Sequence, residues 1–164
     1  MIEVTSVDAL VRESCARFSH RPLIVSAEDD SVTTFSKLDA QISKAAHLFQ
    51  DLGIKKGETI SLFLRNSPQF FAPWLGAVRL GAVANPINLG LEKNIDRITY
   101  MITKARAKVF VLEKAFAETA REVRKKAPMV PIVVLDDPAI SDIDWAKRMG
   151  AAPDTFPSVT VRPA

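Results

Sequence analysis

The chain has very few residues of the kinds that build disulfides and metal centres. Among its 164 residues there is one cysteine, Cys15, so no disulfide can form within the chain. The two histidines, His20 and His47, do not make a recognisable zinc site with that cysteine. Cys15 falls on the apolar face of an expected helix, which favours a core residue over a nucleophile. Because low cysteine content fits a reducing compartment, we expect a cytoplasmic protein.

Long hydrophobic runs and strong charge of one sign are also absent. A membrane-spanning helix needs roughly 18 or more consecutive apolar residues, and the best stretch here, residues 70–83, is short and interrupted by Arg79. The N-terminus carries acidic residues and no apolar core, unlike a secretory signal. The net charge of +3 is too small to indicate nucleic acid, and the pairs Lys55-Lys56 and Lys125-Lys126 fit solvated helix ends. We therefore expect no transmembrane segment and no nucleic-acid partner.

Common catalytic and phosphate-binding motifs are missing as well. The six glycines form neither G-x-G-x-x-G nor G-x-x-x-x-G-K-S/T, and no G-x-S-x-G elbow occurs. Adjacent acids such as Asp29-Asp30 and Asp136-Asp137 tend to diverge on a strand or turn, so they are weak acid–base pairs. The cluster Glu28–Asp30 fits an exposed turn better than a cation site. The residues alone therefore assign no catalytic residue and no metal ligand, and they leave the cofactor-binding residues unknown.

What the chain does contain is a regular alternation of apolar strands and amphipathic helices from residue 59 onward. This alternation predicts an α/β fold, a mostly parallel sheet with flanking helices, and an N-terminal β-hairpin precedes it. Thr5 or Ser6 is expected to cap the first helix, Ser36 to cap the second, and Gly53 to end the second. The expected strands are 23–27, 32–35, 59–64, 82–87, 108–112 and 131–135, and the expected helices are 7–18, 36–52, 68–80, 92–104, 114–126 and 143–149.

The composition changes after Leu135, where proline, aspartate and small residues become frequent. Such a composition is typical of a connector. We therefore expect an α/β subdomain over residues 1–137 and a Pro-rich connector over residues 138–164, with a short helix inside it.

The corner Arg65-Asn66-Ser67-Pro68 is the most site-like stretch of the sequence. It follows a strand expected to be parallel, and ligands of open α/β sheets bind at the carboxyl ends of such strands. Ser67 as a helix cap and Pro68 as the first helical residue explain the same residues without a ligand. The aromatic residues that follow, including Phe70 and Trp74, have helical spacing and favour a packed helix face.

Taken in order, several short motifs resemble the N-terminal part of the adenylate-forming (AMP-binding) superfamily, which includes the acyl-CoA synthetases. The resemblance covers about Val7 to Leu135, and its strength lies in the order and spacing of the motifs. The matching segments are Phe35-Ser36-Lys37-Leu38, Leu52-Gly53 with Gly57-Glu58, Asn66-Ser67 with Gln69-Phe70, Arg79 to Val83 with Pro86 and Asn88, and "ITYMITKARAKVFV" at 98–111.

The resemblance implies an enzyme that uses ATP, Mg²⁺ and CoA to turn a carboxylate into an acyl-adenylate and then a thioester. The family's phosphate loop, roughly Thr-Ser-Gly-Thr-Thr-Gly-x-Pro-Lys-Gly, follows a segment like "VTVRPA" and is absent from these 164 residues. Many CoA ligases carry Pro-Arg after the position of Asn88, where this chain has Leu89-Gly90. We therefore expect no ATP, Mg²⁺ or CoA to bind this chain alone.

Three functions remain open from the sequence, and an unrelated nucleotide-binding α/β domain is the least favoured of them because no Gly-rich first βα turn occurs. The first is an N-terminal piece of an ATP-dependent acyl-CoA synthetase, inactive alone and completed by a C-terminal companion segment or subunit. The second is a non-catalytic scaffold or regulatory binding module derived from that family, with a homo-oligomer as a possible assembly. Charge-stabilising groups around the phosphates carry most of such catalysis, and they are missing here.

Overall fold

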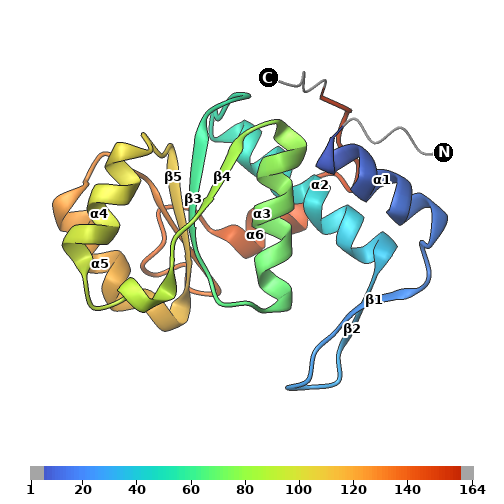
Figure 1. The fold of residues 1–164 in the computed structure, drawn as a ribbon, viewed down its shortest axis with the longest axis horizontal. Helices are drawn as coiled ribbons and strands as arrows, with labels where there is room; N and C mark the ends of the chain where they lie inside the picture. Colours follow the sequence, from blue (N-terminus) through green and yellow to red (C-terminus); the bar gives the residue numbers. More distant parts are fainter. Residues whose placement is uncertain (1–5, 160–164) are drawn as a thin grey trace.

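The fold is a parallel four-stranded sheet between two helical layers, with a separate two-stranded hairpin (Figure 1). The computed structural model describes residues 6–159. The prediction of an α/β fold with an N-terminal hairpin is confirmed. In chain order the elements are α1 Val7–Arg17, β1 Pro22–Val25, β2 Val32–Thr34, α2 Phe35–Asp51, β3 Thr59–Phe63, α3 Pro68–Leu80, β4 Val83–Pro86, η1 Leu89–Leu91, α4 Ile95–Lys104, β5 Val109–Glu113, η2 Lys114–Phe116, α5 Ala117–Lys126, β6 Ile132–Leu135 and α6 Trp145–Ala151.

The strand order β4-β3-β5-β6 places the early strand β3 in the middle of the sheet. All three strand pairings are parallel, with Ile60 opposite both Ala84 of β4 and Val109 of β5. In Figure 1, α4 and α5 lie on one side of the sheet and α2, α3 and α6 on the other. The connection after β3 therefore crosses one face of the sheet, and the connection after β5 crosses the opposite face.

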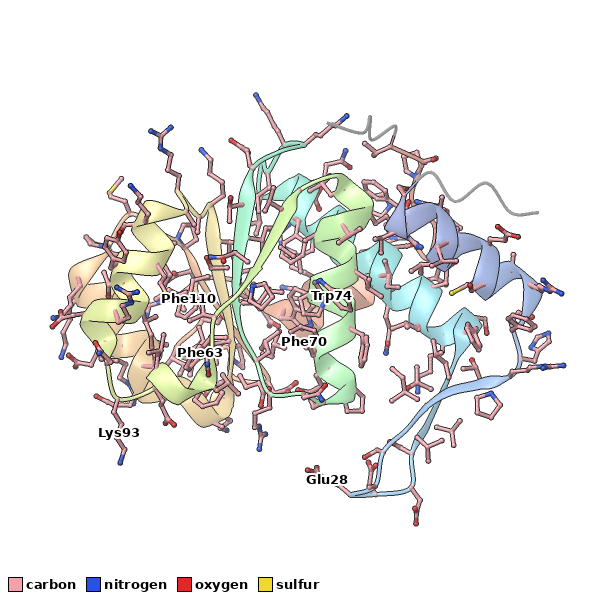
Figure 2. The ribbon with its side chains drawn as sticks, in the orientation of Figure 1. Glu28, Phe63, Phe70, Trp74, Lys93 and Phe110 are labelled. Atoms are coloured by element: carbon pink, nitrogen blue, oxygen red, sulfur yellow. The ribbon has the colours of Figure 1, made fainter. Side chains whose placement is uncertain are left out.

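Apolar side chains fill both faces of the sheet, as the apolar strands predict. Successive residues of one strand alternate between the two layers, because side chains of a strand point to opposite faces. The residues packed with α2, α3 and α6 include Ile60, Leu62, Leu64, Val109, Val111, Val133 and Leu135. Those packed with α4 and α5 include Phe63, Phe110, Leu112, Ile132 and Val134, and Phe63 meets Phe110 between the layers (Figure 2).

Several predicted helix starts are corrected by the structure. The second helix begins at Phe35 instead of after Ser36, and the Thr34 hydroxyl accepts from the Lys37 amide at 3.2 Å. The helix expected from residue 92 begins at Ile95, because Asn94 caps it through the Arg97 amide at 3.0 Å. The helix expected from 114 starts with the short 3₁₀ turn η2. Ser6 caps α1, and the alternative cap Thr5 lies outside the described residues.

Residues after β6 pack back onto the domain. The Phe156 side chain is 4% exposed and lies in the core, and Arg12 of α1 donates to the Phe156 carbonyl at 2.9 Å. His47 of α2 contacts this segment, because its Nε2 is 2.8 Å from the Thr155 carbonyl oxygen. The outer edge of β6 is covered too, because Ser141 and Asp142 hydrogen-bond its backbone amides at 3.0 and 2.7 Å.

Helices α2 and α3 approach each other very closely at Gly76. A Cβ atom added to Gly76 would lie 2.6 Å from the Ala45 Cβ, well inside contact distance. Small residues at this crossing let the two helices form a tight pair on one face of the sheet. Within residues 6–159, none of the helices is both long and apolar enough to cross a membrane.

A buried arginine joins this helix pair to α1. Arg79 of α3 is 1% exposed, and its Nε donates to Asp8 of α1 at 2.8 Å. Its Nη1 donates to the Ser43 hydroxyl at 2.8 Å and to the Asp39 carbonyl at 3.1 Å. Its Nη2 lies 2.7 Å from Asp39 Oδ1, an ion pair without a well-aligned hydrogen bond. One guanidinium thus links three helices.

Removing this cation should destabilise the fold. In Arg79→Ala, the buried Asp8 carboxylate loses its main partner, and breaking a buried pair costs about 3–5 kcal/mol. We expect a loss of about 3 kcal/mol in the free energy of unfolding in urea, since Arg12 still pairs with Asp8 at 2.7 Å. Arg121→Ala, which breaks the exposed pair with Glu118, is the control and should cost under about 1 kcal/mol. Equal losses in the two variants would contradict the role of Arg79.

Burial also sets the chemistry of Cys15. Its thiol is 5% exposed, and burial raises its pKa to about 11, with a further increase from Asp39 and an opposing effect of Arg79. The ordinary value is 9.0, so at pH 8 the share of thiolate should be roughly 100-fold smaller here. Because the folded state holds the thiol proton more tightly, the contribution of that proton to stability is complete below about pH 9 and is lost as pH rises through about 11.

We predict that iodoacetamide labels Cys15 very slowly at pH 8 and that the rate rises about tenfold per pH unit up to about pH 10, because only the thiolate reacts. Mass spectrometry of timed samples measures this. The urea-unfolded chain is the control and should label rapidly at pH 8. Rapid labelling of the folded chain at pH 8 would show an activated thiol instead.

Candidate functional site

The carboxyl edge of the sheet holds the most site-like residues, where β3 and β5 end side by side. In open α/β sheets, the crevice forms where neighbouring strands lead to helices on opposite faces. Here β3 leads to α3 and β5 leads to α5, so the crevice position lies between the ends of these two strands. Arg65 follows β3, and Glu113 is the last residue of β5.

An ion pair between these two residues fills that position. Glu113 accepts from the Arg65 backbone amide at 2.5 Å and from its Nε at 2.6 Å. The Glu113 side chain is only 5% exposed, whereas the Arg65 side chain is 61% exposed. The hydrogen bond and the charge of Glu113 raise the pKa of Arg65. The two strand ends are thereby tied together, and the remaining guanidinium nitrogens face solvent.

The next residues of the corner start α3. Pro68 is the first helical residue, as predicted. Ser67 occupies the cap position with extended backbone, but its side chain makes no cap hydrogen bond, so that part of the prediction is wrong. The Phe70 amide donates instead to the Ser67 backbone oxygen at 3.0 Å. The Ser67 hydroxyl is buried with no partner among the described residues.

The aromatic residues behind the corner form a packed cluster. The Phe70 and Trp74 ring centroids are 5.5 Å apart, and those of Phe71 and Trp74 are 6.2 Å apart. Figure 2 shows Phe70 and Trp74 next to α3, on the side that faces the sheet and α2. The rings therefore serve helix packing, as their spacing predicts.

The turn after β4 is also explained by local bonding. Asn88 accepts from the Gly90 amide at 2.8 Å through its side-chain oxygen. Asn85 donates to the Ser61 hydroxyl of the neighbouring strand at 3.1 Å. Residues 88–90 carry no cation, and Lys93 is the first cation that follows them.

Two small cavities lie beside the corner. One, of about 290 Å³, separates the hairpin from Asn66 and Ser67. The other, of about 160 Å³, has the side chains of Thr33, Gln41, Gln69, Asp136 and Trp145 in its wall. These groups can hydrogen-bond a small polar molecule. They do not include a nucleophile paired with a base, nor a glycine-rich turn for phosphate.

The acidic pairs weighed in the sequence have separate local roles. Asp29 accepts from the Ser31 amide at 3.1 Å in the hairpin turn, and bonds from Ser26 and Ser31 lower its pKa. Glu28 lies at the hairpin tip (Figure 2). Asp137 accepts from the Ala139 amide at 3.2 Å. Between residues 6 and 159, no group of three histidine, cysteine or acidic side chains is placed to hold a metal ion.

Glu113 is not among the residues predicted from the sequence as a strand or site residue. The strand predicted over residues 108–112 ends one residue before it, whereas β5 includes it. The sequence does contain a signal for this residue, because a charged residue directly continues an apolar central strand. Buried charges are nearly always paired, so this position predicts a charged partner.

Loss of the Arg65 side chain should weaken the corner. In Arg65→Ala, the buried Glu113 carboxylate keeps only the backbone amide as a partner, and an under-satisfied buried polar group costs about 1–3 kcal/mol. We expect a loss in that range in urea unfolding at pH 7. Lys108→Ala removes a cation paired with Glu58 at 3.2 Å near the other end of β5, with both side chains more exposed than Glu113, and serves as the control. An Arg65→Ala chain as stable as the parent would show that Glu113 needs no side-chain partner.

Comparisons with known proteins agree on one family. The model of the AMP-binding enzyme family matches residues 11–163. The crotonobetaine/carnitine–CoA ligase of Citrobacter koseri is 32% identical over 103 residues, which are 62% of this chain and 20% of that protein. The Salmonella arizonae ligase of the same name is 29% identical over 57% of this chain and 18% of its own length. The chain thus spans about a fifth of the curated relatives it matches.

Solved structures show the same fold. A fatty acyl CoA synthetase of Mycobacterium tuberculosis matches 97% of this chain and 31% of its own, with a TM-score of 0.84 and 23% identity. The N-terminal domain of FACL13 from the same organism matches 95% of this chain and 38% of its own, with a TM-score of 0.84 and 24% identity. The resemblance inferred from the motifs is confirmed: the chain has the fold of the N-terminal domain of FACL13, and it belongs to the AMP-binding enzyme family.

Proposed function

We propose that this chain serves as the N-terminal α/β part of an ATP-dependent acyl-CoA synthetase. The observation that carries the proposal is the family match over residues 11–163. In the proposed reaction, a carboxylate oxygen attacks the α-phosphorus of ATP, which gives an acyl-adenylate and pyrophosphate. The CoA thiol then displaces AMP and forms the thioester. We propose that this reaction takes place in the cytoplasm, where a single thiol such as Cys15 stays reduced.

In this proposal, residues 1–137 are the N-terminal subdomain and residues 138–164 are a connector, which packs back through Phe156. ATP, Mg²⁺ and CoA would be bound by the complete enzyme and not by this chain alone. The described residues supply a rigid sheet edge, because the Arg65–Glu113 pair fixes the ends of two central strands. Most of the Arg65 side chain is exposed there, while residues 88–90 carry no cation for a CoA phosphate and Lys93 is the first cation that follows them. A companion segment or subunit would supply the phosphate loop.

A second candidate is a non-catalytic binding module. It is favoured by exposed apolar residues on the hairpin, where Val25 is paired with Val32 and the two are 63% and 45% exposed. Exposed apolar side chains that gather on one surface mark a partner site or a homo-oligomer contact.

The exchange of labelled pyrophosphate into ATP separates these functions. We expect no exchange by the 164-residue chain with crotonobetaine, carnitine or straight-chain fatty acids, because stabilisation of the phosphates is missing. A longer polypeptide that contains this chain and a phosphate loop should exchange with at least one acid. The same polypeptide with its loop lysine replaced by alanine is the control. Exchange by the short chain alone would contradict the proposal, and an inactive longer polypeptide would favour the binding module.

A further inference from the structure

The hairpin formed by β1 and β2 is a separate two-stranded sheet that projects from the helices (Figure 1). A hairpin of two strands is marginally stable by itself, and further strands or a packed surface are needed to hold it. One face of the hairpin packs on the helical core through Ile24. Because side chains alternate along a strand, the next residue, Val25, points to the other face, where it is 63% exposed.

The backbone of β1 also has an open hydrogen-bonding edge at Val25. The Ser26 amide donates to the Ser31 carbonyl at 3.0 Å, across the hairpin. Because successive N–H groups of a strand point in opposite directions, the Val25 N–H points away from β2. Among residues 6–159, β2 is the only strand that pairs with β1. An open edge at an exposed apolar residue is a surface to which another strand can bind.

Val25 also lines the cavity of about 290 Å³ between the hairpin and the corner, together with Asn66 and Ser67. The Ser67 hydroxyl is buried and has no hydrogen-bond partner within the described chain. Among the described residues that line the cavity, Glu28 is the only charged one. Its carboxylate disfavours an anionic ligand such as a nucleotide. A peptide backbone, which is neutral and carries both a donor and an acceptor, suits these surroundings.

We propose that an extended segment of the companion polypeptide adds a third strand to β1 at Val25 and fills this cavity, where its backbone hydrogen-bonds the Ser67 hydroxyl. The length of a matched domain supports this occupant. The chain covers 38% of the solved N-terminal domain of FACL13, so most of that single domain has no counterpart here. The inference rests on the proposed function, in which a companion completes the enzyme, and it names a surface to which the companion binds.

Amide hydrogen exchange tests the added strand. In the 164-residue chain, we expect the Val25 amide to exchange almost as fast as in an unfolded peptide. In the longer polypeptide that also contains a phosphate loop, it should exchange at least about 100-fold more slowly, because it donates to the added strand. Mass spectrometry of overlapping fragments measures both rates. The Ser26 amide, which already donates to Ser31, is the internal control, and its rate should change less.

The Ser67 hydroxyl provides a second test. In the 164-residue chain it makes no cap hydrogen bond and has no described partner, so Ser67→Ala should leave the midpoint of urea unfolding unchanged or raise it. In the longer polypeptide the same change removes a hydrogen bond and leaves its partner unsatisfied, so the midpoint should fall. Ser43→Ala removes the hydroxyl that accepts from Arg79 at 2.8 Å, and this control should lower the midpoint in both.

Pyrophosphate exchange by the same longer polypeptide separates this inference from the proposed function. Val25 exchange as fast as in the short chain would overturn the inference, and an active polypeptide with that result would leave the proposed function standing. Slow Val25 exchange in an inactive polypeptide would support the inference and favour the binding module. A lower midpoint for Ser67→Ala in both chains would contradict the role of Ser67. If Val25 is already protected in the 164-residue chain and light scattering shows a dimer, a second copy covers the edge and the proposal is wrong.

Discussion

The buried guanidinium of Arg79 is the interaction on which the arrangement of the first three helices depends. It lies in α3, yet its bonds go to Asp8 of α1 and to Asp39 and Ser43 of α2. A buried cation of this kind costs free energy unless it is paired and hydrogen-bonded, so these bonds hold the helices in one relative position. The glycine contact at Gly76 brings α2 and α3 close enough for these bonds. The hairpin lies between α1 and α2 in the chain, so both of its ends are attached to helices that Arg79 joins.

The second fixed point is the pair formed by Arg65 and Glu113. It joins the ends of β3 and β5 at the position where open α/β sheets form their ligand crevice. A charge pair that occupies this position strengthens the edge and leaves less room for a ligand there. The corner that follows β3 therefore has a structural explanation in which Arg65 and Pro68 each have a defined role. The buried hydroxyl of Ser67 has no hydrogen-bond partner among residues 6–159.

The sequence predicted the layers of the fold and missed details that depend on three-dimensional contacts. Periodicity located every strand within one or two residues. For β3, β5 and β6 the reason is that burial on both faces requires apolar strands. The roles of Thr34 and Asn94 as caps were missed, since several neighbouring residues can cap a helix equally well in a sequence. The Arg79 network and the Arg65–Glu113 pair join residues 71 and 48 positions apart, and no local pattern connects them. The apolar groove between α1, the hairpin, α2 and α3 could not be predicted from the sequence for the same reason.

We infer that this chain of the AMP-binding enzyme family is a scaffold and that its carboxyl-edge corner does not itself bind nucleotide. The most direct test is a two-dimensional amide NMR titration of the 164-residue chain with ATP and Mg²⁺, and separately with CoA. We expect no saturable chemical-shift change at the amides of residues 65–67, 69 and 88–90. A saturable shift at those amides, with a micromolar Kd for either ligand, would contradict it.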